Sequence, residues 1–340
     1  MNYLYQYLLF LAEVASVGLA VVIAAGALIG MSTRNRREGA GHIEIRRLND
    51  QFEAVRDVLD DMFLSGRELR RANKARKKER DAAGTRSRVF VLDFQGDIEA
   101  SATDALREEV SGILVACRDG DEVVVRLESA GGVVHGYGFA ASQLARIKAR
   151  GLRLVVAVDK IAASGGYLMA CIADELISAP FALLGSIGVL VEVPNVHRLL
   201  KKHDVDVEIL TAGEHKRTLT LLGQNTDEGR AKLLEEIEDV HKLFQEFVGE
   251  HRPNIELAKV ATGEAWYGTR ALGLSLVDRL ETSDQYLQSK LATTELLGVA
   301  WVVHRKGVEG LMERLSGALF SRFANASWLR NLLRGIATQN

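Results

Sequence analysis

The sequence lacks a strong excess of charge of either sign. Its 43 lysines and arginines nearly balance 45 aspartates and glutamates, which gives a formal net charge of -2. This balance excludes a global basic field for nucleic acid, so we expect no nucleic-acid partner. Cysteine is scarce as well: Cys117 and Cys171 stand far apart and fit neither CxxC nor any metal-ligand spacing. We interpret both as small core residues and disfavour a disulfide between them.

A long apolar run is present at the N-terminus. Residues 8–31 are apolar or small with few interruptions, which is long enough to span a bilayer. A cleavable signal peptide is disfavoured because residues 1–7 carry no basic side chain. A buried helix of a soluble protein is the alternative, but Arg34, Arg36 and Arg37 follow at once and favour a retained single-pass anchor. These arginines place the chain after residue 31 on the cytoplasmic side.

A charged segment, residues 32–88, follows the anchor and predicts a helical linker. Residues 67–80 form a dense basic run, which indicates a solvated helix or attraction to anionic lipid head groups. Small residues at Gly84–Thr85 mark the boundary with the next domain. The apolar positions at helical spacing are Leu48, Phe52, Val55, Val58, Leu59, Met62 and Phe63.

Residues 89–282 alternate strand and helix patterns, which predicts an α/β domain with functional groups at the strand ends. The expected strands are 89–94, 123–127 and 152–158, and the expected helices are about 136–150 and 227–249. We interpret the apolar stretch 179–193 as a buried strand and its turn rather than a second bilayer span. Residues 283–340 predict a C-terminal strand and a basic amphipathic helical tail, suited to a membrane surface or to subunit packing.

Ser164 stands in the stretch Ala162-Ala163-Ser164-Gly165-Gly166-Tyr167, directly after an apolar run. A nucleophilic serine needs room for substrate, a base and donors for an oxyanion. Ser164 at a strand-to-helix transition offers the room, and the glycines there and at Gly131–Gly132 offer amides. Ser-Gly-Gly also suits an ordinary helix cap. The Gly-x-Ser-x-Gly pattern of α/β hydrolases is absent around Ser164.

Candidate bases for this serine are a histidine or a lysine. His135, His215 and His241 fall in the same region, but none has a local signature with a partner carboxylate. Lys216 follows Gly213 in a polar segment, and it can act as a base only if burial or its neighbours lower its pKa. Without further support, Lys216 reads as a solvated surface residue.

Four motifs in order resemble the signal peptide peptidase A family of serine-lysine proteases, most closely its SohB branch. They are Glu128-Ser129-Ala130-Gly131-Gly132, Ala163-Ser164-Gly165-Gly166-Tyr167, Gly185-Ser186-Ile187-Gly188 and Gly213-Glu214-His215-Lys216. The segment Thr262–Asp278 resembles the family's Gly-x-x-Trp-x-Gly stretch with a small departure, and Ala130 stands where relatives have proline.

The resemblance implies a crotonase-like, ClpP-like α/β fold and an endopeptidase that works through an acyl-enzyme without a metal or organic cofactor. It assigns Ser164 as nucleophile, Lys216 as general base, Ser186 as the lysine-orienting residue, and Gly131, Gly132 and Gly165 as the oxyanion hole. It also implies peptide or protein substrates with hydrophobic or signal-peptide-like segments, a place in the bacterial inner membrane, and a homo-oligomer. Longer family members act on the outer side of that membrane, which opposes the orientation drawn from the arginines.

Two other interpretations remain open at this point. A crotonase-like fold also suits acyl-CoA chemistry, because that superfamily uses paired glycine amides to hold an oxyanion. A non-catalytic membrane scaffold would use the charged helices of residues 34–80 and 307–336 for assembly. Coenzyme A thioester binding would identify the first, and a cellular role insensitive to Ser164→Ala would identify the second.

Overall fold

The computed structural model describes residues 41–81, 87–213 and 216–303. One compact unit, Ile43–Trp301, contains nearly all of these residues. The predicted anchor, residues 8–31, and the predicted helical tail after residue 303 lie outside the described residues. Within the described ranges, none of the helices combines the length and apolar character needed to cross a bilayer.

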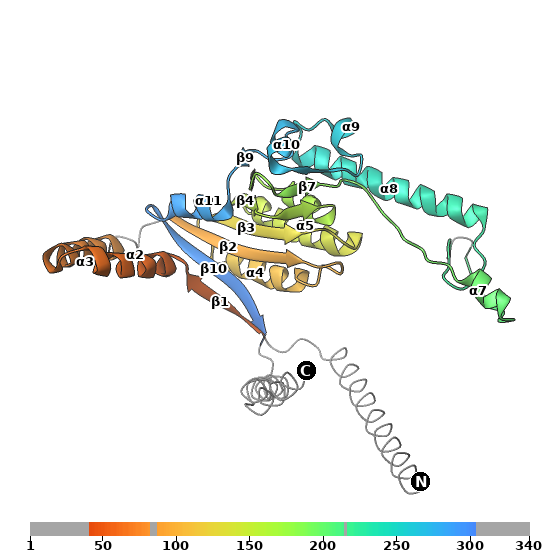
Figure 1. Ribbon diagram of the computed structural model, residues 1–340, viewed down its shortest axis with the longest axis horizontal. Coiled ribbons are helices and arrows are strands. Elements are labelled where there is room, and N and C mark those ends of the chain that lie inside the picture. Colours follow the sequence, from red (N-terminus) through yellow and green to blue (C-terminus); the bar gives the residue numbers. More distant parts are fainter. Residues whose placement is uncertain (1–40, 82–86, 214–215, 304–340) are drawn as a thin grey trace, which may run out of the picture. The chain divides into compact units, whose positions relative to one another are not determined.

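The described strands form a single sheet of ten strands (Figure 1). Its main path runs β1-β10-β2-β3-β4-β6-β9, and β5, β7 and β8 form a branch that joins at β3. The pairings from β10 through β9 are parallel, and β7 pairs with β8 antiparallel. The strands are β1 (Gly41–Arg47), β2 (Ser87–Gly96), β3 (Glu122–Ser129), β4 (Arg153–Val158), β5 (Ile161–Ala163), β6 (Glu175–Ser178), β7 (Leu183–Gly185), β8 (Ala265–Tyr267), β9 (Arg279–Leu280) and β10 (Thr294–Val303).

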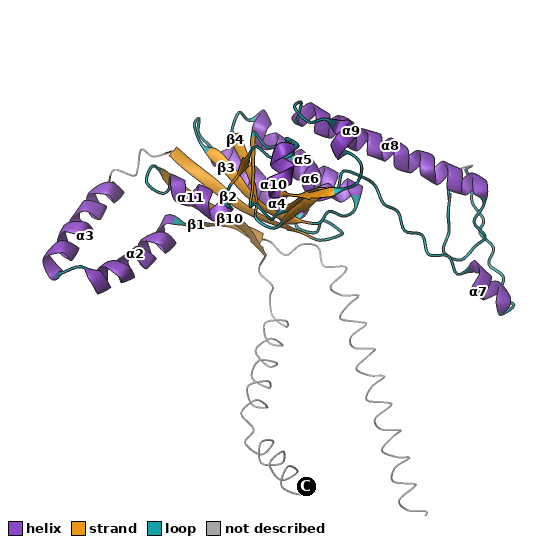
Figure 2. Cartoon of the chain, turned by 45° about the horizontal axis from the view of Figure 1, so that its top comes forward, coloured by secondary structure: helices purple, strands orange, loops and turns teal. Residues whose placement is uncertain are grey.

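The helices of the described chain surround this sheet and extend from it (Figures 1 and 2). The long helix α8 begins at the Thr226 cap, whose hydroxyl accepts a hydrogen bond from the Gly229 amide. The helices are α2 (Asn49–Phe63), α3 (Gly66–Asp81), α4 (Thr103–Ala116), α5 (Val134–Ala149), α6 (Gly165–Ala170), α7 (His197–Lys202), α8 (Asp227–His251), α9 (Leu257–Val260), α10 (Gly268–Gly273) and α11 (Ser283–Lys290).

The core lies on both faces of the parallel strands, which explains their nearly continuous apolar runs. In β2, Phe90, Leu92 and Phe94 belong to the cluster that contains α4 and α5. Val89 and Val91 point to the other face, where they belong to a smaller cluster with α11. Alternation along each strand therefore decides which face a polar side chain occupies at the strand's end.

Three features of the fold differ from the sequence expectations. The charged segment contains the predicted helices but also β1, which lies beside β10 in the sheet. A turn and the three-residue strand β5 come between the apolar run of β4 and Ser164. The apolar stretch expected as a buried strand is buried only in part: Leu184 is in the core, whereas Leu190 is 82% exposed and has no regular secondary structure.

Candidate active site

Ser164 connects the end of β5 to the start of α6, as the sequence predicted. It has a positive φ of 52° with ψ of -121°, a conformation that costs a residue with a side chain about 1–3 kcal/mol. Its amide donates to the Gly185 carbonyl at 2.8 Å, and its carbonyl accepts from the Leu168 amide at 3.0 Å. The surrounding hydrogen bonds thus hold this serine in a strained turn.

The two glycines after Ser164 are required by close packing. A Cβ at Gly165 would lie 2.4 Å from Cγ of Tyr137, inside van der Waals contact. A Cβ at Gly166 would lie 2.5 Å from the carbonyl oxygen of Ser129. Glycine lets the α6 backbone approach α5 and the end of β3 at distances that other residues would not permit.

The Gly131–Gly132 turn lies against Ser164. Gly131 has a φ of 90°, and a Cβ there would lie 2.7 Å from the Cβ of Ser164 and 2.8 Å from the Gly165 amide nitrogen. Gly132 packs on Ile98, whose carbonyl oxygen would lie 2.1 Å from an added Cβ. The structure therefore brings together the two glycine turns predicted from the sequence.

The amides of these turns differ in their partners. The Gly131 amide donates to Ser129 Oγ at 3.0 Å. Gly165 is the first residue of α6, so its amide has no carbonyl one turn earlier in the helix. The assignment of Gly131, Gly132 and Gly165 to an oxyanion hole stays a prediction, and one of its three amides already has a partner.

Ser186 also lies at this end of the sheet. β5 and β7 run parallel with Ala163 beside Gly185, so Ser164 and Ser186 are the next residues on neighbouring strands. Ser186 has a positive φ of 50°, and its amide donates to the Glu264 carbonyl at 2.6 Å. The lysine-orienting role of Ser186 stays a prediction.

In the part of the chain that the structure describes, no hydrogen bond joins Lys216 to Ser164. Its side chain is exposed, and its amide donates to the Gly213 carbonyl at 3.2 Å. Lys216 belongs to an extension that we call the arm, residues 189–226. Figures 1 and 2 both show α7, which is part of the arm, beyond the first residues of α8 and away from the sheet.

The arm folds on itself and exposes apolar side chains. The Val196 amide donates to the Leu221 carbonyl at 2.9 Å, and Asn195 Nδ2 donates to the carbonyls of Thr220 and Gly223. Leu210 is 91% exposed. Other large apolar side chains exposed on the arm are Leu190, Val191, Val193, Leu199, Val205, Ile209, Leu221 and Leu222.

Two of the three candidate histidines belong to the described residues. His241 Nε2 lies 3.2 Å from the carbonyl oxygen of Ile187, and His135 is exposed. His215 lies outside the described residues. Among the described residues, no group of three or more His, Cys, Asp or Glu side chains is arranged to hold a metal ion.

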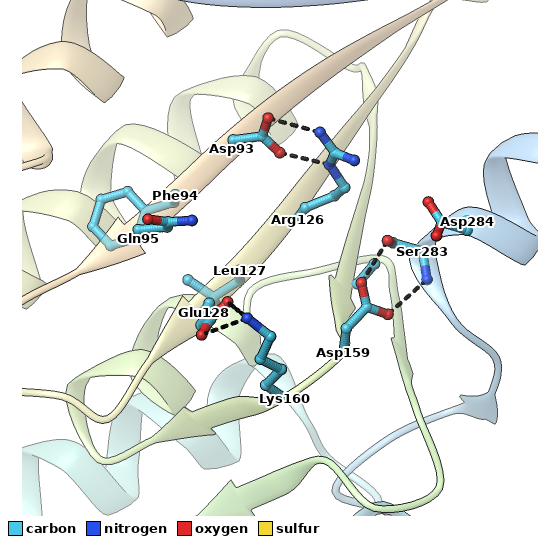
Figure 3. A pocket seen from close by; sticks show the side chains of 11 residues that line it. Asp93, Phe94, Gln95, Arg126, Leu127, Glu128, Asp159, Lys160, Ser283 and Asp284 are labelled. Atoms are coloured by element: carbon cyan, nitrogen blue, oxygen red, sulfur yellow. Dashed lines mark hydrogen bonds and ion pairs between the residues drawn. The ribbon is translucent and has the colours of Figure 1, made fainter. Parts of the chain in front are cut away.

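A polar pocket of about 350 Å³ opens on the α11 face of the sheet (Figure 3). Neither Ser164 nor the glycine turns line it. Hydrogen bonding to the Asp93 carboxylate raises the pKa of Arg126 in this pocket. Polar side chains pair across it as Asp93 with Arg126, Glu128 with Lys160, and Asp159 with Ser283. The charged groups of this pocket are therefore already hydrogen-bonded to one another. We place the candidate chemistry at Ser164 instead.

A strained serine at a strand-to-helix turn, flanked by a second glycine turn, is an arrangement typical of enzymes with a serine nucleophile. Two family models match the chain: Peptidase family S49 N-terminal over residues 2–144 and Peptidase family S49 over residues 146–296. The chain belongs to peptidase family S49 and is a serine-type peptidase.

Individual relatives cover most of the chain. "Probable protease SohB" of Haemophilus influenzae is 48% identical over 311 residues, which are 87% of this chain and 88% of that protein. "Probable protease SohB" of Buchnera aphidicola subsp. Acyrthosiphon pisum is 41% identical over 339 residues, 98% of this chain and all of that protein. A solved structure of the 1510-N membrane-bound stomatin-specific protease with a substrate peptide has a TM-score of 0.43 and 10% identity, covering 63% of this chain and 92% of that one.

Two residues of this site were not identified from the sequence. The sequence motifs include Ser129 only as part of a glycine turn and assign no role to Tyr137. Ser129 is buried at the end of β3, and the Tyr137 hydroxyl is its partner. The sequence indicates the burial of Ser129 in part, because Ser129 lies on the same face of the strand as Val123, Val125 and Leu127.

Proposed function

We propose that this chain is a membrane-anchored endopeptidase in which Ser164 is the nucleophile and Lys216 the general base. The observation that carries the proposal is Ser164 itself, held at a positive φ against the Gly131 turn. Strain of this kind gathers at sites where a side chain must be presented to substrate. Residues 8–31 would provide the anchor in the bacterial inner membrane.

The reaction follows from these roles. Ser164 Oγ attacks the scissile carbonyl carbon while neutral Lys216 takes the hydroxyl proton, and glycine amides bind the oxyanion that forms. The carbon–nitrogen bond then breaks, and Lys216 passes its proton to the leaving amine. Water attacks the resulting acyl-enzyme by the same route and restores the Ser164 hydroxyl. Ser186 would hold the lysine in position.

We infer that the dyad forms between copies of the chain. A free lysine has a pKa of about 10.4, so a lysine base needs a dry site that lowers this value. Lys216 is exposed on the arm of a single chain. Docking of the apolar arm on a second copy would bury Leu190 and Leu210 and bring Lys216 to that copy's Ser164. A homo-oligomer would then be required for activity.

The substrates we propose are extended peptides with hydrophobic segments, such as remnant signal peptides or fragments of membrane proteins. The test is cleavage of fluorogenic peptides and a denatured protein by the detergent-solubilised full chain. Ser164→Ala and Lys216→Ala should each abolish cleavage and keep the wild-type circular dichroism spectrum. Activity retained in either folded variant would remove that residue from the dyad.

A mixing experiment tests the dyad between copies. Ser164→Ala and Lys216→Ala chains, co-expressed in equal amounts, should regain about a quarter of wild-type activity. Each site takes its serine from one copy and its lysine from another, so random assembly gives both intact residues at about one site in four. A mixture of Ser164→Ala with the Ser164→Ala/Lys216→Ala double variant is the matched control and should stay inactive. No recovery in the first mixture would place both residues of each dyad on the same chain.

A further inference from the structure

The Tyr137 hydroxyl belongs to a hydrogen-bonded chain that ends at the Gly131 turn. The hydroxyl donates to the carbonyl oxygen of Asp97 at 2.7 Å and lies 2.5 Å from Ser129 Oγ. A tyrosine hydroxyl has one hydrogen, and the Asp97 carbonyl can only accept. The Ser129 hydroxyl must therefore donate to Tyr137, and Ser129 Oγ accepts from the Gly131 amide at 3.0 Å.

These hydroxyls are sealed from solvent. Tyr137 is fully buried and Ser129 is 2% exposed. A Cβ at Gly96, the partner of Ser129 across the β2–β3 pairing, would lie 2.3 Å from the Tyr137 hydroxyl and 2.5 Å from Ser129 Oγ. Burial raises the pKa of Tyr137, which keeps its hydroxyl protonated at neutral pH. The hydrogen bonds therefore run in one direction, and a side chain at position 96 would not fit beside them.

The same two residues also touch the turn that carries Ser164. The Tyr137 ring lies under Gly165, and the Ser129 carbonyl lies under Gly166. The Tyr137 ring thus packs directly against the Gly165 turn. Its hydroxyl is linked to the Gly131 turn through Ser129. A shift of either residue would change the spacing of the Gly131 and Gly165 amides.

We propose that Tyr137 and Ser129 are positioning residues for the oxyanion hole, and that they commit the Gly131 amide to Ser129 so that Gly132 and Gly165 are the donors to the oxyanion. This inference rests on the proposed function. Tyr137 and Ser129 do not touch the reacting atoms; they fix the turns that do. Loss of the Tyr137 hydroxyl frees Ser129 to rotate and loosens the Gly131 turn.

The test is Tyr137→Phe, which keeps the ring and removes the hydroxyl, measured on the detergent-solubilised full chain. Tyr167→Phe is the matched control, because Tyr167 is also fully buried and its hydroxyl also donates to a carbonyl, that of Leu276 at 2.9 Å. Removal of one oxyanion donor lowers kcat by about 100- to 1000-fold, so a displaced turn should lower it by about 10- to 100-fold. KM should stay within about 2-fold, since ground-state binding is unchanged.

A second readout separates positioning from a general loss of structure. A peptide boronate forms a tetrahedral adduct on the serine, and its affinity for Tyr137→Phe should fall by the same factor as kcat/KM. Ser129→Ala, which removes the acceptor of the Gly131 amide, should give the same pattern. It also provides the test if Tyr137→Phe does not fold.

Three results would overturn the inference. Wild-type kcat in Tyr137→Phe and Ser129→Ala would show that the hydrogen-bonded chain does not position the hole. Equal losses of kcat in Tyr137→Phe and Tyr167→Phe would reduce its role to stability. Failure of the proposed function looks different, because the wild type itself would then cleave no peptide and bind no boronate at Ser164, and the inference would fall with it.

Discussion

Gly131 is the residue at which backbone conformation and contact with Ser164 can be separated experimentally. Alanine at Gly131 would hold a φ of 90°, which costs about 1–2 kcal/mol. Its Cβ would also lie 2.7 Å from the Cβ of Ser164 and 2.8 Å from the Gly165 amide nitrogen. Such overpacking costs about 1–3 kcal/mol more, so we expect Gly131→Ala to lower the free energy of unfolding by about 2–5 kcal/mol.

Gly120 provides the control for this prediction. It has nearly the same φ, 87°, but nothing lies within 4 Å of an added Cβ. Gly120→Ala should therefore lose only the conformational share, about 1–2 kcal/mol, and keep full activity. Urea unfolding followed by circular dichroism measures both values, and peptide cleavage measures the activity. Equal losses of stability and activity in the two variants would refute the claim that the Gly131 turn is packed against Ser164.

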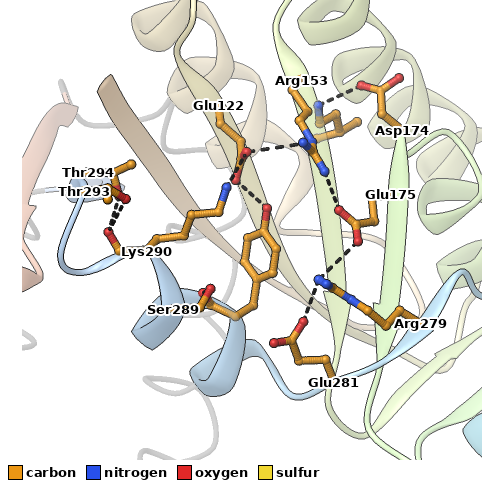
Figure 4. Close-up of polar contacts among 12 residues, drawn as sticks. Glu122, Arg153, Asp174, Glu175, Arg279, Glu281, Ser289, Lys290, Thr293 and Thr294 are labelled. Carbon is orange, nitrogen blue, oxygen red and sulfur yellow. Dashed lines mark hydrogen bonds and ion pairs between the residues drawn. The ribbon is translucent and has the colours of Figure 1, made fainter. Parts of the chain in front are cut away.

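Three further predictions concern residues outside the site. Tyr286→Phe removes a 2.7 Å hydrogen bond to the buried Glu122 carboxylate (Figure 4) and should cost about 1.5–3 kcal/mol in urea unfolding; a cost near zero would show that this contact adds nothing. Burial raises the pKa of Glu109, whose carboxylate accepts from the Trp301 amide. A carboxyl group whose pKa is higher in the folded than in the unfolded chain destabilises the fold at pH values above the folded-state pKa, and has no such effect below the unfolded-state pKa. Glu109→Gln should therefore be more stable than wild type at pH 7 and equally stable near pH 3. A gain in stability that does not change with pH would contradict this. Burial raises the pKa of Cys171 to about 12, so a thiol reagent should label it only after unfolding; rapid labelling of the native chain would contradict its burial.

The sequence pattern predicted the α/β alternation because the strands are long apolar runs bounded by glycine turns. The expected strand at 152–158 corresponds to β4, Arg153–Val158, and the expected helix at 136–150 corresponds to α5, Val134–Ala149. β5 was not predicted, since three residues are too few to display a period of two. β1 was also missed, because it has only two large apolar residues, Ile43 and Ile45, and its partner β10 lies far away in sequence.

The site was predictable where its chemistry is local. Ser164 and its glycines are contiguous, and their crowding is visible in the composition of that stretch. The partners of Tyr137 were not predictable, because its hydroxyl bonds Asp97, 40 residues earlier, and no local pattern shows that contact.

A structure of the full chain with a peptide boronate would test the central claim most directly. We expect a covalent bond from boron to Ser164 Oγ, one boronate oxygen within hydrogen-bond distance of the Gly132 and Gly165 amides, and Lys216 of a second copy beside Ser164. A boronate bound to another residue, or a complex with no lysine at Ser164, would contradict it.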